Sequence, residues 1–142
     1  MIYTDLTKEA MKICFAAHKE QLDKSGMPYV FHPFHLAEQM PDEYTTAAAL
    51  LHDTVEDAGI TLEYLTERGM PDCVTDAVRL LTHDDSVPYL DYVRKIKCND
   101  IAKTVKRADL IHNSDLTRLD NVGEEDLRRA EKYRKAIEIL NE

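Results

Sequence analysis

Apolar residues recur along the whole chain at the three- and four-residue spacing of an α-helix. Between Leu6 and Gln21, for example, Ala10, Ile13, Cys14 and Ala17 fall on one face. No segment shows a convincing alternation of apolar and polar residues, which is the pattern of a half-buried β-strand. The periodicity therefore predicts an all-α fold.

Proline, glycine and capping residues divide this pattern into separate helices. The stretch "KSGMPY" ends the first helix, and Pro33 fits the first position of a short second helix with His32 just outside it. Thr61 suits the N-cap of the fourth helix, and Gly123 precedes the last. The expected helices are 6–21, a short one from 33, 42–57, one from 62, 71–81, 89–97, 100–118, and one after Gly123 that ends at Leu140.

Length and composition indicate one globular unit. A chain of 142 residues with 44% hydrophobic and 32% charged residues can bury a single core without disulfides or a structural metal. We find no internal repeat and no low-complexity segment. We therefore expect a single domain over residues 1–142.

Charge and cysteine usage narrow the setting and the partners. A net charge of −9 without a lysine- or arginine-rich stripe counts against nucleic-acid and membrane-surface binding. Asp5 and Lys8 interrupt what would have to be an apolar targeting core, and no apolar run reaches membrane-spanning length. The three cysteines are far apart and form no CxxC pair, so we expect free thiols in a cytoplasmic protein.

Two predicted helices carry carboxylates on apolar faces. In "ALLHDTVED", His52 and Asp53 follow a buried run, and Asp109 shares a face with aliphatic residues in the helix 100–118. Burying an unpaired carboxylate costs several kcal/mol, so each needs a cation nearby. Lysine or arginine could serve, but a set of His32, His52, Asp53 and Asp109 offers the mixed nitrogen and oxygen ligands suited to Mn, Fe, Co or Zn.

Glu56 and Asp57 lie one helical turn beyond the first His-Asp pair. At this spacing they face the same way as the pair and could act as a general base or orient an attacking water. The alternative is that they are solvated acids at a helix end. A second His-Asp pair, His83-Asp84, falls in a polar loop before Pro88, which shows that the dipeptide alone indicates little.

Three motifs resemble a known enzyme family. "YVFHP", "ALLHDTVED" and "VKRADLIHN" match, in order and spacing, the HD-domain hydrolases of the RelA/SpoT type, including the small stand-alone alarmone hydrolases. The resemblance spans residues 17–113 and implies an HD-domain helical bundle. It also implies removal of pyrophosphate from the 3′ position of guanosine tetra- or pentaphosphate. It implies one divalent metal, usually manganese, bound by His32, His52, Asp53 and Asp109. It further implies that Glu56 and Asp57 position or activate the attacking water, and that Asn113 contacts the nucleotide.

Further residues are candidates for the nucleotide substrate. Three tyrosines could stack on a base or simply pack at the edge of the core: Tyr89, Tyr92 and Tyr133. The side chains that could neutralise phosphates, or else be ordinary surface charges, are Lys24, Lys106, Arg107 and Arg118.

One position departs from the family pattern. The loop "QLDKSGMPY" has Asp23 where the resembling hydrolases carry an arginine that touches the base. This difference puts the identity of the nucleotide in doubt more than it does the hydrolysis. Two alternatives therefore stay open beside an alarmone hydrolase: an HD phosphohydrolase for another nucleotide, and a nucleotide-binding domain without turnover.

Overall fold

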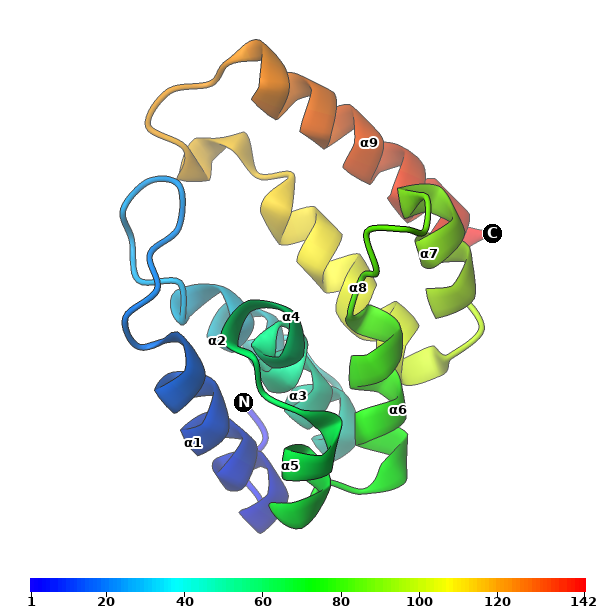
Figure 1. Ribbon diagram of the computed structural model, residues 1–142. Coiled ribbons are helices and arrows are strands. Elements are labelled where there is room, and N and C mark those ends of the chain that lie inside the picture. Colours follow the sequence, from blue (N-terminus) through cyan, green and yellow to red (C-terminus); the bar gives the residue numbers. More distant parts are fainter.

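The structure, a computed structural model that describes residues 1–142, is built from helices (Figure 1). It has no β-sheet, and an isolated bridge between Leu22 and Pro28 is the only extended pairing. The expected all-α class is confirmed. The elements are α1 (Asp5–His18), α2 (Phe31–Glu38), α3 (Glu43–Leu51), α4 (Thr54–Ala58), α5 (Leu62–Glu67), α6 (Asp72–Leu81), α7 (Tyr89–Ile96), α8 (Asp100–Asn113), the 3-10 helix η1 (Leu116–Arg118) and α9 (Glu124–Asn141).

Helix α3 is the centre of the core. It packs against α1, α2, α6 and α8, and every residue from Thr45 to Leu51 is buried. A helix that is apolar nearly all round must be enclosed by its neighbours. Asp42 caps its N-terminus by accepting a hydrogen bond from the backbone N–H of Thr45 at 2.8 Å. The end of α3 therefore delivers His52 into the interior of the bundle.

Helices α8 and α9 pack along each other, and α8 lies between α9 and the central helix α3 (Figure 1). The loop after α1 and the segment between α8 and α9 meet at one end, where the Ser25 hydroxyl donates to the Arg118 carbonyl at 2.9 Å. No helix is long and apolar enough to span a bilayer.

The second helix begins earlier than the proline suggested. Because α2 starts at Phe31, His32 and Pro33 both lie in its first turn, so the prediction that His32 stands outside the helix is wrong. The first backbone N–H groups of a helix have no partner within it, so the missing N–H of Pro33 costs nothing there. The first helix also ends earlier than expected, at His18.

The expected single helix over 42–57 is interrupted at His52 and Asp53. Asp53 has φ −106° and ψ 0°, and the short α4 follows. His52 Nδ1 lies 2.7 Å from the Ala49 carbonyl, and the Thr54 hydroxyl donates to the Leu51 carbonyl at 2.8 Å. Side chains that bond to backbone carbonyls compete with helix continuation. The interruption turns the Asp53 carboxylate towards the ring of His52.

The expected helix 100–118 is likewise shorter. Helix α8 ends at Asn113, and Asp115 then caps η1 by accepting the Thr117 backbone N–H at 3.0 Å. As a result, Arg118 leaves the axis of α8 and faces the loop after α1.

The central position of α3 predicts a large cost for emptying it. Leu50→Ala should lower the free energy of unfolding by about 2–5 kcal/mol, because Leu50 is fully buried and its loss leaves a cavity. Leu127→Ala, at a residue that is 54% exposed, is the control and should change little. Urea denaturation measures both, and equal losses in the two variants would contradict the assignment of α3 as the core helix.

Candidate functional site

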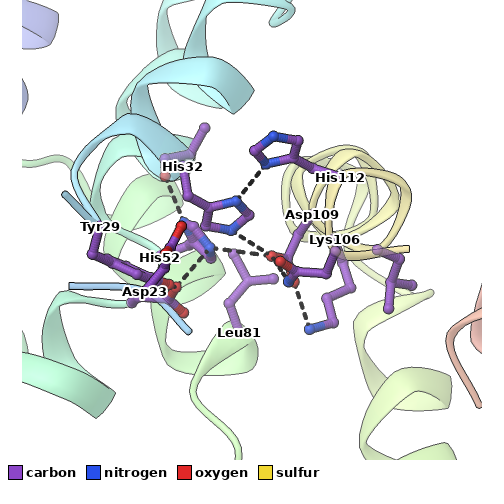
Figure 2. A network of polar contacts seen from close by, with 12 residues as sticks. Asp23, Tyr29, His32, His52, Leu81, Lys106, Asp109 and His112 are labelled. Atoms are coloured by element: carbon purple, nitrogen blue, oxygen red, sulfur yellow. Dashed lines mark hydrogen bonds and ion pairs between the residues drawn. The ribbon is translucent and has the colours of Figure 1, made fainter. Parts of the chain in front are cut away.

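Three buried side chains converge where α2, the end of α3 and α8 meet. His32, His52 and Asp109 each place one nitrogen or oxygen atom within 4.8 Å of the others (Figure 2). Asp109 Oδ1 lies 2.8 Å from His32 Nε2 and 3.5 Å from His52 Nε2. Elements that are far apart in the sequence thus meet at one carboxylate oxygen.

Asp53 completes the expected set on the open side of this cluster. Its Oδ2 lies 3.1 Å from His52 Nε2, and it accepts a hydrogen bond from the Tyr29 hydroxyl. The side chain of Asp53 is 15% exposed, against 7% for Asp109, so Asp53 faces the adjoining pocket. Of the four residues that the sequence indicated as metal ligands, three therefore form the mutual cluster, and Asp53 adjoins it through His52.

The surroundings of His52 fit a bound cation. Its Nδ1 donates to the Ala49 carbonyl, which leaves a lone pair on Nε2. That nitrogen is buried without a hydrogen-bond partner and faces two carboxylate oxygens. Burial would lower the pKa of His52, but the charges of Asp53 and Asp109 raise it well above its ordinary value. A positive centre is thus favoured here, and two imidazoles with two carboxylates suit a divalent transition metal.

Asp109 is the charged centre of the cluster. Burial would raise its pKa, but Lys106 and the two histidines hold that pKa well below its usual range. Lys106 Nζ donates to Oδ2 at 2.8 Å, and the Asn113 amide donates to Oδ1 at 2.9 Å. The sequence left lysine and a metal ion as possible partners for this carboxylate. Lys106 neutralises Oδ2, and Oδ1 faces the two histidines on the side where a metal ion would bind.

His112 contacts the side of His32 that faces away from Asp109. Its Nδ1 lies 2.7 Å from Nδ1 of His32, and the two rings are stacked at 3° to each other. Partial burial, with Arg118 nearby, lowers the pKa of His112 to about 4, so its ring is neutral at pH 7 and can accept the His32 proton. This contact leaves Nε2 of His32 free to face Asp109.

An inner pocket of about 240 Å³ opens from Asp53 and Asp109. Glu56 and Asp57 line it as the sequence predicted. Glu56 accepts the backbone N–H of His83 at 3.0 Å, and Asp57 accepts from the Gln21 amide at 3.3 Å. Burial raises the pKa of each carboxyl, and the charge of Asp53 adds to the effect in both. Raised pKa values make these carboxylates better proton acceptors.

An outer pocket of about 350 Å³ adjoins the inner one and shares Tyr29, Asn113 and Tyr133 with it. Asp23 and Lys24 line the outer pocket, and Lys106 lines the inner one. Each residue predicted to contact substrate therefore lies in one of the two pockets.

The two remaining candidate cations separate. Arg118 lines the outer pocket. Arg107 lines neither pocket, because its exposed guanidinium donates to Asn141 at the end of α9. Of the four cations considered from the sequence, only Arg107 is therefore placed away from the site.

Residues outside the predicted set of ligands, proton acceptors and substrate contacts also line the inner pocket. The His83 ring lines the inner pocket and packs 4.6 Å from the ring of Tyr92, although its His-Asp pair does lie in a loop. The Tyr89 hydroxyl is buried beside the same pocket without a partner. Tyr29 belongs to the motif "YVFHP", and its hydroxyl contacts Asp53. Tyr29 carried a sequence signal through that motif, and Tyr89 was a candidate for stacking on a base; His83 carried no signal beyond a dipeptide that indicates little.

Comparison with known proteins gives a consistent set of relatives. No family model matches the chain. The chain is 32% identical over 149 positions to guanosine-3′,5′-bis(diphosphate) 3′-pyrophosphohydrolase MESH1 of Xenopus tropicalis, an alignment that covers 95% of this chain and 83% of that protein. It is 47% identical over 66 residues to a probable GTP pyrophosphokinase of Mycobacterium leprae, covering 44% of this chain and 8% of that protein.

A solved structure extends this likeness to the whole fold. The structure of a metazoan orthologue of SpoT that hydrolyses ppGpp superposes with a TM-score of 0.77 at 26% identity, over 99% of this chain and 88% of that one. The chain thus spans most of the length of the Xenopus relative but under a tenth of the mycobacterial one.

Proposed function

Because this chain belongs to the family of guanosine-3′,5′-bis(diphosphate) 3′-pyrophosphohydrolases, we propose that it hydrolyses a guanosine polyphosphate and releases pyrophosphate from the 3′ position. The observation that carries the proposal is the buried cluster of His32, His52 and Asp109, which opens into a pocket lined by carboxylates and a lysine. The substrate is a small nucleotide. The three free cysteines suit the reducing cytoplasm, where we place the enzyme.

The proposed cofactor is one divalent metal ion, Mn²⁺, held by His32, His52, Asp53 and Asp109. The mixed nitrogen and oxygen donor set supports this choice, as does the lone pair of His52 Nε2 facing two carboxylates. When bound, such an ion would lower the pKa of its water below the value of about 15.7 for bulk water and would polarise a phosphoryl oxygen.

The proposed proton acceptor is Glu56 or Asp57. Each carboxylate is held in place by a hydrogen bond and has a raised pKa, and each lines the pocket beside Asp53. A carboxylate within reach of the attacking water can take its proton as the bond to phosphorus forms. Lys106 and the partnerless Tyr89 hydroxyl line the same pocket and can donate to phosphate oxygens. Phosphoryl transfer depends mainly on such positioning and charge stabilisation.

Metal content tests the proposed ligands. Wild-type protein dialysed against manganese should hold about one ion per chain, and His52→Ala should lose it together with the stability that the metal confers. Leu50→Ala is the matched control, because it also empties a buried site near the end of α3 but should keep the ion. Elemental analysis that finds no metal in folded wild type, or full occupancy in His52→Ala, would count against the ligand set.

Turnover tests the proposed proton acceptors. Glu56→Gln and Asp57→Asn remove the basic oxygen, so at least one should lower kcat by about a hundredfold or more. Manganese content should stay at the wild-type level in both. Pyrophosphate release from guanosine 3′,5′-bis(diphosphate) gives the rates, and the exposed Glu63→Gln is the control. If both variants match wild type, neither residue acts as the base; if wild type itself is inactive, the domain binds without turnover or acts on another nucleotide.

A further inference from the structure

Two opposite charges face each other in the wall of the outer pocket. Asp23 lies in the loop after α1, and Arg118 ends η1. Asp23 Oδ2 and Arg118 Nη2 are 4.0 Å apart, and the side chains are 23% and 27% exposed. The pair is therefore partly shielded from solvent and still accessible from the pocket.

Hydrogen bonds hold both side chains in place but use only Oδ1 of Asp23 and Nη1 of Arg118. Asp23 Oδ1 accepts the backbone N–H groups of Ser25 at 2.8 Å and Met27 at 3.0 Å. Arg118 Nη1 donates to the His112 carbonyl at 3.0 Å and to the Asn113 side chain at 3.3 Å. A separation of 4.0 Å is too long for a hydrogen bond between the two charges. One acceptor, Oδ2, and the donors on Nε and Nη2 therefore remain for a ligand.

The position of the pair relative to the inner pocket indicates which part of a nucleotide would reach it. If the phosphates occupy the inner pocket, the nucleoside extends past Tyr29, Asn113 and Tyr133, which the two pockets share. A volume of about 350 Å³ is within the range of small-ligand sites. The base then lies against the wall that contains Asp23 and Arg118.

We propose that Asp23 and Arg118 together read the edge of a guanine base. Arg118 donates to the O6 atom, and Asp23 Oδ2 accepts the neighbouring N1–H. The two side chains are close enough to engage adjacent positions on one edge. This inference rests on the proposed function, because the phosphates must occupy the inner pocket for the base to reach the pair.

The same pair disfavours adenine in that orientation. Adenine has an amino donor where guanine has O6, and an unprotonated nitrogen where guanine has N1–H. Both contacts would then set donor against donor and acceptor against acceptor. A well-formed contact to a base edge discriminates by about tenfold to a hundredfold. The charge pair would thus act as a specificity determinant as well as a link between two loops.

Asp23→Asn isolates the reading of the base. Asparagine keeps Oδ1 for the two backbone N–H groups of the loop and replaces Oδ2 by an amino donor, which suits adenine N1 instead of guanine N1–H. The ratio of kcat/KM for guanosine over adenosine 3′,5′-bis(diphosphate) should fall by about tenfold or more, through KM. Arg118→Gln should also raise KM for the guanosine substrate. Manganese content and kcat should remain near wild type in both variants.

Arg79→Gln provides the matched control. Arg79 pairs with Asp76 at 2.6 Å on the solvent-facing side of α6, away from both pockets, and its substitution should leave the ratio unchanged. If wild type hydrolyses the guanosine substrate but neither pocket variant alters the base preference or KM, the inference is overturned and the proposed function stands.

If wild type releases no pyrophosphate, the proposed function fails and binding decides the inference. Calorimetry with guanosine and adenosine 5′-diphosphates then measures base preference directly. A guanine preference that Asp23→Asn removes would support the pair as the base reader, and the absence of such a preference would overturn it.

Discussion

The buried carboxylate of Asp109 is the interaction on which the site depends. An ionised carboxylate in a helical core costs several kcal/mol unless positive charge and hydrogen bonds surround it. Lys106 holds one of its oxygens, and the other meets His32 and His52 on elements more than fifty residues away in sequence. Because the core helix α3 is apolar and buried, the residue at its end, His52, lies in the interior beside Asp109.

Around this charge, irregular backbone does most of the positioning. The interruption after α3 turns Asp53 towards His52 and directs α4, with Glu56 and Asp57, into the inner pocket. The loop after α1 and the segment around Arg118 close the outer pocket, and Tyr29 contributes to both pockets. The proposed hydrolysis and the proposed base recognition would thus take place in neighbouring pockets that different segments of the chain line.

Sequence reasoning reached the fold class, and it singled out His52, Asp53 and Asp109, which the fold brings close to one another, because both rest on local physics. Helical periodicity showed the elements, and charges on apolar faces showed that His52, Asp53 and Asp109 needed an explanation. It missed the break at His52, because the bonds to the Ala49 and Leu51 carbonyls compete with a helix that periodicity alone would continue. Tertiary pairings were also invisible: Asp23 suggested a lost cation in the base pocket, whereas the fold brings Arg118 beside it.

Anomalous X-ray scattering from crystals grown with manganese tests the central claim most directly, because it locates the ion independently of turnover. We predict a single strong manganese peak between Nε2 of His32, Nε2 of His52 and the carboxylates of Asp53 and Asp109. Crystals that show no peak at this point, or a water-sized peak without anomalous signal while manganese binds elsewhere, would contradict the account of the buried charge as a metal site.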